Sequence, residues 1–337
     1  MELRPGLVLV VGPNGVGKTN LLEAAHVATQ GFSPRTRTDS QVVRFHQEGA
    51  RVAVVGRRGE VGLELEVTVR RGEGKRARLN GAPLRAAEQL RSIVSTLVFT
   101  PDRLGVVKGP PAVRRAYFDR VLGRLVPARA ALPVEYGAVV AQRNAALRRT
   151  AAGLSGREAI EPWSERVATL GAELVAARLE ALAQIEPMFV ARAAEFGLDR
   201  TSLRYAGDPP TTDGLEGVLD RDLERGATSL GPHLDDVVLA AAGSDLRTFG
   251  SQGEQRLALL ALLLAEAETI ADRTGVPPFL LLDDVLSELD PSRRRILAAR
   301  VRSAGQALIT ATDAAMLPVA PDQLLEVTPG TVLEAAA

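Results

Sequence analysis

Cysteine is absent from this 337-residue chain, which excludes disulfide bonds and zinc sites built from thiolates. The absence is compatible with a reducing cytoplasm. Long hydrophobic runs are absent too: the longest, 257–265, has nine residues, whereas a helix needs about 20 to span a bilayer. The N-terminus lacks the charged-then-apolar pattern of a secretory signal. We therefore expect a cytoplasmic protein without a membrane segment.

Aromatic residues are scarce, at 4%, and the 41 basic residues are balanced by 41 acidic ones. With so few rings, base stacking cannot dominate a contact to nucleic acid, and phosphate contacts are the alternative. The charge balance excludes a protein that is strongly basic over its whole length. The three histidines, His26, His46 and His233, are too scattered to indicate a metal site. Hydrophobic residues make up 46% of the chain, enough for the cores of one large or two moderate domains.

A complete phosphate-binding loop follows the apolar run 7–11, with the sequence Gly12-Pro13-Asn14-Gly15-Val16-Gly17-Lys18-Thr19 and then Asn20. A helical pattern follows it, and this strand–loop–helix context is what the motif needs. Glycines let backbone N–H groups turn toward phosphate oxygens. Lys18 is expected to reach the β- and γ-phosphates, and the Thr19 hydroxyl to bind Mg²⁺. The sequence therefore predicts a site for ATP and Mg²⁺.

Two aspartates, Asp283 and Asp284, end the apolar run 279–282. Ligands of open α/β sheets bind at the carboxyl ends of the strands, so this pair is placed where a nucleotide would lie. Asp283 is the expected Mg²⁺ partner, and Asp284 the candidate to position or activate the attacking water. Together with Lys18 they are the candidate catalytic residues. The alternative is an ordinary acidic turn after a strand.

The segment Ser251-Gln252-Gly253-Glu254-Gln255 has the pattern of a capping box, and apolar residues at helical spacing follow it. A helix start is therefore expected. The serine and glycine at such a start also form a seat for an anion. A chain with one phosphate loop has no second phosphate of its own to seat. The seat becomes useful if it meets the γ-phosphate held by another protomer, which predicts an ATP-dependent homodimer.

These motifs, in this order, resemble the ABC-type ATPases, and the form Ser-Gln-Gly-Glu-Gln-Arg is similar to that of the RecF family. Further matches are Lys18 to Ala24, Pro111 with Arg114, Arg115 and Asp119, the stretch 142–147, and the stretch 231–236. The resemblance implies a weak ATPase that acts as a switch in DNA replication, recombinational repair and the SOS response. It implies binding to gapped DNA or single-strand/double-strand junctions, loading of the recombinase, and the partners RecR and RecO.

The same resemblance implies that Ser251, Gly253 and Gln255 contact nucleotide and that Asp290 belongs to the D-loop. Asp290 also fits a helix N-cap, because Pro291 follows it. The family usually has a β-strand before the phosphate-loop strand, so we expect a misassigned start or a missing strand. Three further departures predict slow hydrolysis: Thr100 in place of a glutamine, Thr312 in place of the switch histidine, and Asp284 where many relatives have glutamate. In the stretch 231–236, Leu234 replaces the usual arginine.

The expected fold class is α/β, an ABC-type P-loop ATPase head with a mostly helical inserted arm domain. The head is expected to comprise 1–105 plus 227–337, and the arm 106–226. Strands are expected near 51–55 and 62–69, a hairpin turn at Asn80-Gly81, and long helices over 136–149 and 165–196, the second kinked or split by Pro187.

Ser251 lies 233 positions after Lys18, a longer separation than a transporter ATPase needs. The sustained heptads of a long-armed SMC protein are lacking. A compact helical arm lies between those limits, as in the RecF family, and this resemblance favours DNA binding. The candidate surface for DNA lies between Arg51 and Arg85, where there are nine basic and only four acidic residues. The candidate DNA contacts are Arg57, Arg58, Arg70, Arg71, Lys75, Arg76, Arg114 and Arg115, with Arg143, Arg148 and Arg149 as further arm candidates. Three alternatives stay open: a solvated hairpin, a transport or assembly ATPase without DNA affinity, and a nucleotide-binding scaffold that never hydrolyses.

Overall fold

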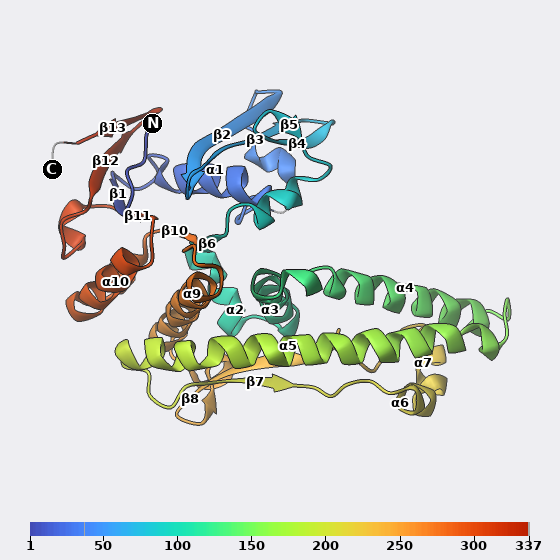
Figure 1. Cartoon of the computed structure of the whole chain (residues 1–337). Coiled ribbons are helices and arrows are strands. Elements are labelled where there is room, and N and C mark those ends of the chain that lie inside the picture. The colour runs from blue at the N-terminus through green and yellow to red at the C-terminus, as the bar shows by residue number, and fades with distance from the viewer. Residues whose placement is uncertain (37, 336–337) are drawn as a thin grey trace. The chain divides into compact units, whose positions relative to one another are not determined.

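The computed structural model describes residues 1–36 and 38–335 (Figure 1). Its contacts divide the chain into two compact units, Met1–Arg103 with Leu260–Ala337, and Leu104–Leu259. The second division falls inside helix α9 (Gln252–Thr274), whereas the sequence places the domain boundary at 226/227. The compact units are defined by contacts within the chain, whereas the expected domains are defined by where the ATPase motifs lie. The assignment of 227–259 to an ATPase head therefore stays a prediction.

The first unit is built on a six-stranded sheet in the order β13-β12-β1-β11-β10-β6. All neighbouring pairs are parallel except β12 with β13. Because the parallel strands share one direction, their carboxyl ends lie along one edge of the sheet. The strands are β1 (Leu7–Val11), β6 (Thr96–Phe99), β10 (Phe279–Leu282), β11 (Ala307–Ala311), β12 (Gln323–Thr328) and β13 (Thr331–Glu334).

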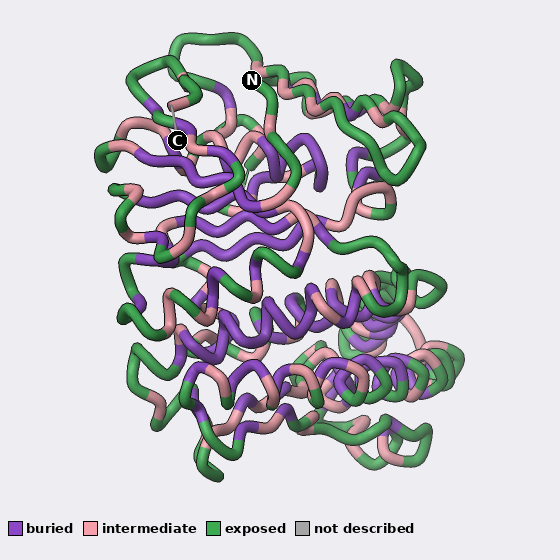
Figure 2. Tube along the Cα trace, turned by 60° about the vertical axis from the view of Figure 1, so that its left-hand side comes forward, coloured by how far each residue is buried: buried purple, intermediate pink, exposed green. Residues whose placement is uncertain are grey.

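The core of this unit lies where helix α1 (Lys18–Gln30) packs on the sheet. Strands β1 and β11 are mostly apolar without alternation and are buried along their whole length, as expected for parallel strands covered on both faces (Figure 2). Leu22 of α1 joins Val8, Leu281 and Leu308 in one cluster. Helix α10 (Pro291–Ser303) connects β10 to β11. The helices and strands therefore fix the loops at the carboxyl edge.

A second, antiparallel sheet in the first unit has the order β2-β3-β4-β5, with bounds β2 (Gly49–Arg58), β3 (Val61–Arg70), β4 (Gly74–Leu79) and β5 (Ala82–Pro83). Alternate residues of β3, Leu65, Val67 and Val69, are buried in a cluster with Val27 of α1. The expected turn at Asn80-Gly81 is confirmed. Both of its residues have positive φ, 50° and 79°, as a type I′ turn requires.

The second unit is mostly helical. Its helices are α2 (Gly105–Lys108), α3 (Pro111–Leu125), α4 (Leu132–Ala151), α5 (Glu161–Glu195), α6 (Thr212–Gly217), α7 (Leu219–Arg225) and α8 (Leu246–Phe249), and it holds a small sheet of β7 (Ser202–Ala206), β8 (Asp236–Ala241) and β9 (Ser244–Asp245). Helices α4 and α5 lie side by side (Figure 1). Pro187 does not split α5, since Ile185 and Phe189 on either side are fully buried and hold both turns. Among the described helices, none has the length and apolarity to cross a membrane.

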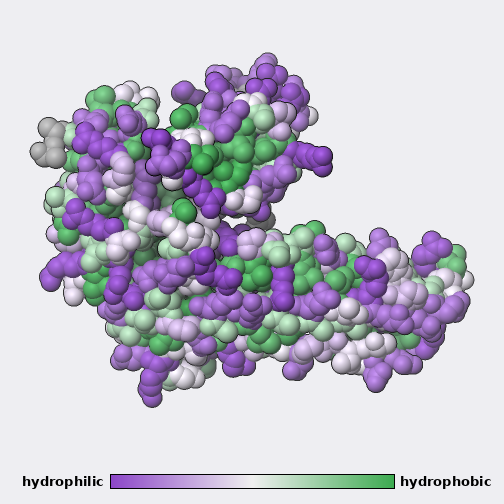
Figure 3. All heavy atoms as spheres, viewed as in Figure 1, coloured by the Kyte–Doolittle hydropathy of each residue, from purple (hydrophilic) through white to green (hydrophobic). Residues whose placement is uncertain are grey.

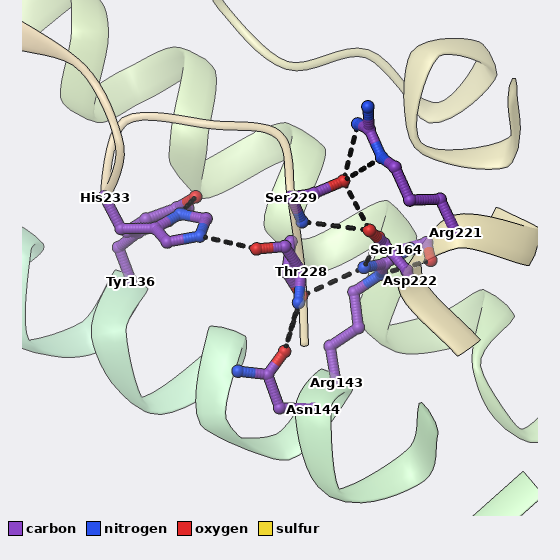
Figure 4. A network of polar contacts seen from close by, with 9 residues as sticks. All are labelled: Tyr136, Arg143, Asn144, Ser164, Arg221, Asp222, Thr228, Ser229 and His233. Atoms are coloured by element: carbon purple, nitrogen blue, oxygen red, sulfur yellow. Dashed lines mark hydrogen bonds and ion pairs between the residues drawn. The ribbon is translucent and has the colours of Figure 1, made fainter. Parts of the chain in front are cut away.

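Buried polar contacts hold the loop between α7 and β8 against the helices of this unit (Figure 4). The Arg143 Nη1 donates to Asp222 Oδ2 over 2.6 Å and to the Thr228 hydroxyl over 2.9 Å. Neither side chain of the Arg143–Asp222 pair has any exposed surface. Asp222 Oδ1 in turn accepts from the N–H of Ser229 over 3.0 Å. The charges of this pair are therefore compensated inside the core, as burial requires.

A neutral histidine continues this network. His233 Nε2 lies 3.1 Å from the Thr228 carbonyl, which can only accept, so Nε2 carries the proton and Nδ1 accepts from the Tyr136 hydroxyl at 2.9 Å (Figure 4). Burial lowers the pKa of His233, which agrees with a neutral ring. A second polar contact lies in the same unit, where Arg178 donates to both carboxylate oxygens of Asp119 over 2.8 and 3.0 Å. His233 is thus a structural residue here.

Candidate nucleotide site

The phosphate-binding loop joins β1 to α1, as predicted, and its glycines are needed for two different reasons. Gly15 and Gly17 have φ of 80° and 116°, a region that side chains rarely adopt, and a Cβ on either would meet nothing within 4 Å. At Gly12 a Cβ would lie 2.7 Å from the Val327 carbonyl oxygen. Space above Gly15 and Gly17 is therefore open, while Gly12 permits close packing on β12.

Lys18 lies over this loop and is almost completely buried. Its ammonium donates to the carbonyl oxygens of Gly12 over 2.7 Å and Pro13 over 3.0 Å. An ammonium has three donors, so one is left for another acceptor. A cation fixed at an open loop of N–H groups suits an anionic ligand such as a phosphate chain.

Three hydroxyl and carboxylate groups converge beside the loop. Asp283 Oδ1 accepts from the hydroxyl of Thr19 over 3.1 Å and from that of Thr310 over 2.8 Å. Asp283 follows β10, Thr19 is the second residue of α1, and Thr310 lies in β11. The sheet therefore brings together the two predicted Mg²⁺ residues and adds Thr310, which sequence reasoning missed. A hydroxyl oxygen and a carboxylate form the oxygen donor set that Mg²⁺ prefers.

Asp284 has a backbone φ of 50°, in the left-handed region that aspartate tolerates better than most residues. Its Oδ1 is buried and, within the described residues, has no hydrogen-bond partner. The Thr100 hydroxyl at the end of the neighbouring strand β6 is in the same condition. Buried polar atoms are rarely left unpaired, so this edge of the sheet fits water or a bound ligand. Thr312, by contrast, contacts the Met316 sulfur at 3.3 Å and is exposed.

Two further residues flank the loop helix and were missed by sequence reasoning. Arg35 Nη1 lies 3.3 Å from Glu23 Oε2 and 3.5 Å from the Asn20 side-chain oxygen. Ser33 also donates to Glu23. Asn20 and Glu23 are three residues apart on one helix face, and that spacing is the only sequence signal for a shared partner. An arginine is thereby held beside the first turn of α1.

The Ser251 segment forms the expected capping box at the start of α9. The Ser251 hydroxyl accepts from the Glu254 N–H over 3.2 Å, and Glu254 Oε2 accepts from the Ser251 N–H over 2.8 Å. The Ser251 N–H also lowers the pKa of Glu254. Ser251 and Gly253 are exposed, but Gln255 is buried and donates to the Leu246 carbonyl over 2.8 Å. Gln255 thus has a hydrogen-bond partner inside its own unit, and its expected nucleotide contact stays a prediction.

Asp290 is the N-cap of α10, because its Oδ1 accepts from the N–H groups of Ser292 and Arg293, each over 2.9 Å. The bond from the Arg293 N–H, above all, lowers the pKa of Asp290. The carboxylate is exposed. Its placement in a D-loop stays a prediction.

The predicted DNA contacts on the β2–β5 sheet are mostly engaged locally. Arg57 pairs with Glu60, and Arg70 and Arg76 both pair with Glu73, at 3.5–3.7 Å. Both glutamates are among the four acidic residues already counted in this segment, so the basic surplus stays. Three other candidates also have partners within the first unit. Lys75 forms ion pairs with Asp39 and Glu88. Arg58 donates to the Ile93 carbonyl, and Arg71 donates to the Gln47 and Val43 carbonyls. Hydrophilic side chains still surround the ends of these strands (Figure 3).

The two arm candidates lie inside the second unit. Arg114 is buried and donates to both oxygens of Asp236, over 2.7 and 2.6 Å. Arg115 is partly buried and donates to the Asp235 carbonyl over 2.5 Å. Buried Arg143 is equally committed. Arg114 and Arg143 thus hold the unit together and present no guanidinium to DNA, which corrects the sequence expectation for them.

The family of this chain follows from its similarity to known proteins. A family model described as "RecF/RecN/SMC N terminal domain" matches residues 1–332. A DNA replication and repair protein RecF from Symbiobacterium thermophilum is 39% identical, over 99% of this chain and 93% of its own. The chain belongs to the RecF family. Another RecF-family relative, from Heliobacterium modesticaldum, is 36% identical over 96% of this chain and 90% of its own.

Solved structures agree with this RecF-family assignment. The structure of "the recombination mediator protein RecF-ATP in RecFOR pathway" has a TM-score of 0.90 and 27% identity, over 100% of this chain and 93% of that one. An SMC head domain from Pyrococcus furiosus has a TM-score of 0.57 at 16% identity, over 98% of this chain and 90% of that one, which shows a shared fold alone. The predicted fold class is confirmed: an ABC-type ATPase fold of mixed α and β structure.

Proposed function

We propose that this RecF-family chain is an ATP-dependent DNA-binding protein that dimerises on ATP and promotes recombinational repair at single-strand gaps and junctions. It helps to load the recombinase, and slow ATP hydrolysis serves as a switch. The observation that carries the proposal is the arrangement of Thr19, Asp283 and the unpaired Asp284 carboxylate oxygen at one edge of the sheet. The relatives named for DNA replication and repair, and the one solved with ATP, support the same function.

Each residue of the loop has a distinct part in this proposal. Backbone N–H groups around Gly15 and Gly17 hold the phosphates, and Lys18 adds its charge to the β- and γ-phosphates. Thr19 and Asp283 hold Mg²⁺, which when bound neutralises phosphate charge. Asp284 orients the attacking water with its unpaired oxygen. An aspartate is shorter than a glutamate, so we expect slow turnover.

The ATP site is completed by a second copy of the chain in this proposal. Ser251 and Gly253 are exposed at the start of α9, a 23-residue helix. The helix's partial positive charge, and those N–H groups of its first turn that the capping box does not bond, favour an anion there. A γ-phosphate held by the partner's phosphate loop is the anion proposed. RecR and RecO are the proposed mediator partners, since the solved relative is described within the RecFOR pathway.

Replacing Asp284 by asparagine is expected to slow ATP hydrolysis at least ~10-fold, the size expected for losing a water-orienting carboxylate. ATP binding should survive, because Thr19, Lys18 and Asp283 are untouched, and the ATP-bound dimer should persist longer. Phosphate release measures the first effect and nucleotide filter binding the second. Asp220→Asn, which changes an exposed carboxylate paired with Arg157, is the matched control. Full activity in Asp284→Asn would remove Asp284 from the mechanism.

Removing Arg70 and Arg76 together is expected to weaken DNA binding in a salt-dependent way. Both side chains are largely exposed and are paired only loosely with Glu73. If each touches one phosphate, the slope of log affinity against log salt should flatten by about 1.8 per protomer, at about 0.9 per contact. Affinity should fall alike on unrelated sequences, because no base-edge contact is involved. Fluorescence anisotropy over a salt series measures both.

The control for this experiment is Arg157→Ala, which removes an exposed arginine from the second unit. Nucleotide binding should be unchanged in the double variant, since neither arginine lies in the phosphate loop. A double variant with wild-type affinity and slope would mean that the hairpin is merely solvated. Arg148 and Arg149, on the last turn of α4, would then be the next surface to test.

A further inference from the structure

Thr310 is a fully buried polar residue in β11, and its hydroxyl contacts both aspartates of the candidate site. It donates to Asp283 Oδ1 over 2.8 Å and accepts from the Asp284 N–H over 2.9 Å. A hydroxyl has a single donor, so that donor is committed to Asp283. One side chain therefore joins the carboxylate assigned to the cation and the residue assigned to the water.

We propose that Thr310 is a positioning residue of the ATP site, which sets the Asp283 carboxylate and the Asp284 backbone in one fixed arrangement. This inference rests on the proposed ATPase function. Strand β11 lies between β1 and β10, the strands that lead into the phosphate loop and the aspartate pair. Thr310 is paired with Val10 of β1, one residue beyond the last pairing of β11 with β10. It is thus placed where β10 has ended and the backbone of Asp283 and Asp284 turns away.

On the Asp283 side, two hydroxyl groups bind the same carboxylate oxygen. Thr19 reaches Oδ1 at 3.1 Å and Thr310 reaches it at 2.8 Å. Rotation of the carboxylate would break both bonds at once, so the second donor makes the orientation more rigid. The Thr19 hydroxyl donates its hydrogen bond to Asp283, which leaves the lone pairs of the Thr19 oxygen available for a cation. Losing Thr310 would therefore loosen the contact through which Asp283 orients Thr19.

On the Asp284 side, the Thr310 hydroxyl is the acceptor for a backbone N–H in a sparsely populated conformation. Asp284 has a φ of 50°, which is uncommon outside glycine. Without an acceptor, this partly buried N–H would favour a rearranged backbone. Rearrangement would move the side chain whose Oδ1 is buried and unpaired within the described residues. Thr310 thus holds the direction of that oxygen.

The test compares Thr310→Val, which keeps the side-chain shape and removes the hydroxyl, with Thr310→Ser, which keeps the hydroxyl. Residues that orient metal ligands typically contribute about 10- to 100-fold to metal affinity or activity. Thr310→Val should therefore raise the Mg²⁺ concentration for half-maximal hydrolysis at least ~10-fold and lower kcat, with little change in KM for ATP. Thr310→Ser should restore most of both.

The matched control is Thr96→Val. Thr96 is a fully buried threonine of the same sheet, and its hydroxyl donates to the Thr29 hydroxyl over 2.9 Å. It lies at the opposite end of the strands, in β6. Its loss should lower thermal stability without changing the Mg²⁺ requirement. A shift in the Mg²⁺ requirement that is equal in Thr96→Val and Thr310→Val would mean general destabilisation and would overturn the proposal.

Two readouts do not depend on turnover. In the nucleotide-free protein, hydrogen exchange of the peptide covering 279–290 should speed up at Asp284 by roughly fivefold or more in Thr310→Val, the size of one lost hydrogen bond, and return in Thr310→Ser. In the second, the Mg²⁺ dependence of binding a fluorescent ATP analogue should shift in Thr310→Val alone. A wild-type protein that binds no ATP would instead count against the proposed function. If the wild-type protein binds ATP and Thr310→Val shows the same Mg²⁺ dependence of that binding, Thr310 does not position the site.

Discussion

Replacing Ser251 by arginine is expected to abolish ATP-dependent dimerisation while ATP binding persists. Ser251 is exposed at the start of α9 and belongs to the second compact unit, whereas the phosphate loop belongs to the first. If this start seats a γ-phosphate of another protomer, a long cationic side chain would fill the seat and block closure. The dimerisation constant should weaken ~100-fold or more, which corresponds to about 2.7 kcal/mol. Light scattering at several protein concentrations, with ATP and Mg²⁺, measures it.

The experiment has to separate two roles of Ser251, as the N-cap of α9 and as the proposed binding position for the γ-phosphate. Ser251 caps α9 by accepting from the Glu254 N–H. Ser251→Ala loses the cap, at a cost of about 1 kcal/mol, but leaves the seat open. We expect it to dimerise more weakly than wild type and far better than Ser251→Arg. Ser303→Arg, at the exposed end of α10, controls for adding a charge. A normal ATP-dependent dimer in Ser251→Arg would rule out the composite site.

Replacing Arg143 by alanine is expected to destabilise the second unit by about 3–5 kcal/mol, because it leaves the Asp222 charge buried and unpaired. Both side chains of the pair have no exposed surface, and Thr228 and Ser164 also lose hydrogen bonds (Figure 4). Urea unfolding followed by circular dichroism measures the loss. Nucleotide binding at low temperature should persist, because the phosphate loop belongs to the other compact unit.

An exposed ion pair of the same unit supplies the control for Arg143. Arg157 and Asp220 are joined at 2.6 Å but are mostly exposed, so Arg157→Ala should cost no more than about 1 kcal/mol. If Arg143→Ala costs as little as Arg157→Ala, the buried network does not hold the arm. Arg143→Leu combined with Asp222→Leu should be less harmful than Arg143→Ala alone, since no unpaired charge is left.

The sequence predicted those parts of the molecule that short-range patterns determine. A glycine-rich loop after an apolar run, an aspartate pair after another, and a capping box each specify their own local structure, and all three have the expected local form. The turn at Asn80 is similar, because its backbone conformation depends on two adjacent residues. The sheet order then brings Thr19 and Asp283, 264 positions apart, into contact.

Side-chain partners far away in sequence could not be predicted in this way. Arg114 and Arg143 read as surface charge, yet both are buried, and each has a carboxylate partner more than 70 residues further along the chain. Gln255 belongs to a nucleotide motif but turns inward to α8. Thr310 carried a faint signal, a lone hydroxyl in an apolar strand, which acquires meaning only when β11 is known to lie beside β10. Packing, not pattern, decides these roles.

The most direct test of the account is the affinity of the wild-type chain for gapped DNA in the presence of ATP, of ADP and of no nucleotide, each with Mg²⁺. Filter binding or fluorescence anisotropy at fixed salt is sufficient, with an intact duplex as the second substrate. We predict at least ~10-fold tighter binding with ATP than with ADP, because two protomers then contact one DNA and their contributions combine. Equally weak binding in all three conditions, together with normal ATP binding, would contradict the account and favour an ATPase of a transport or assembly complex.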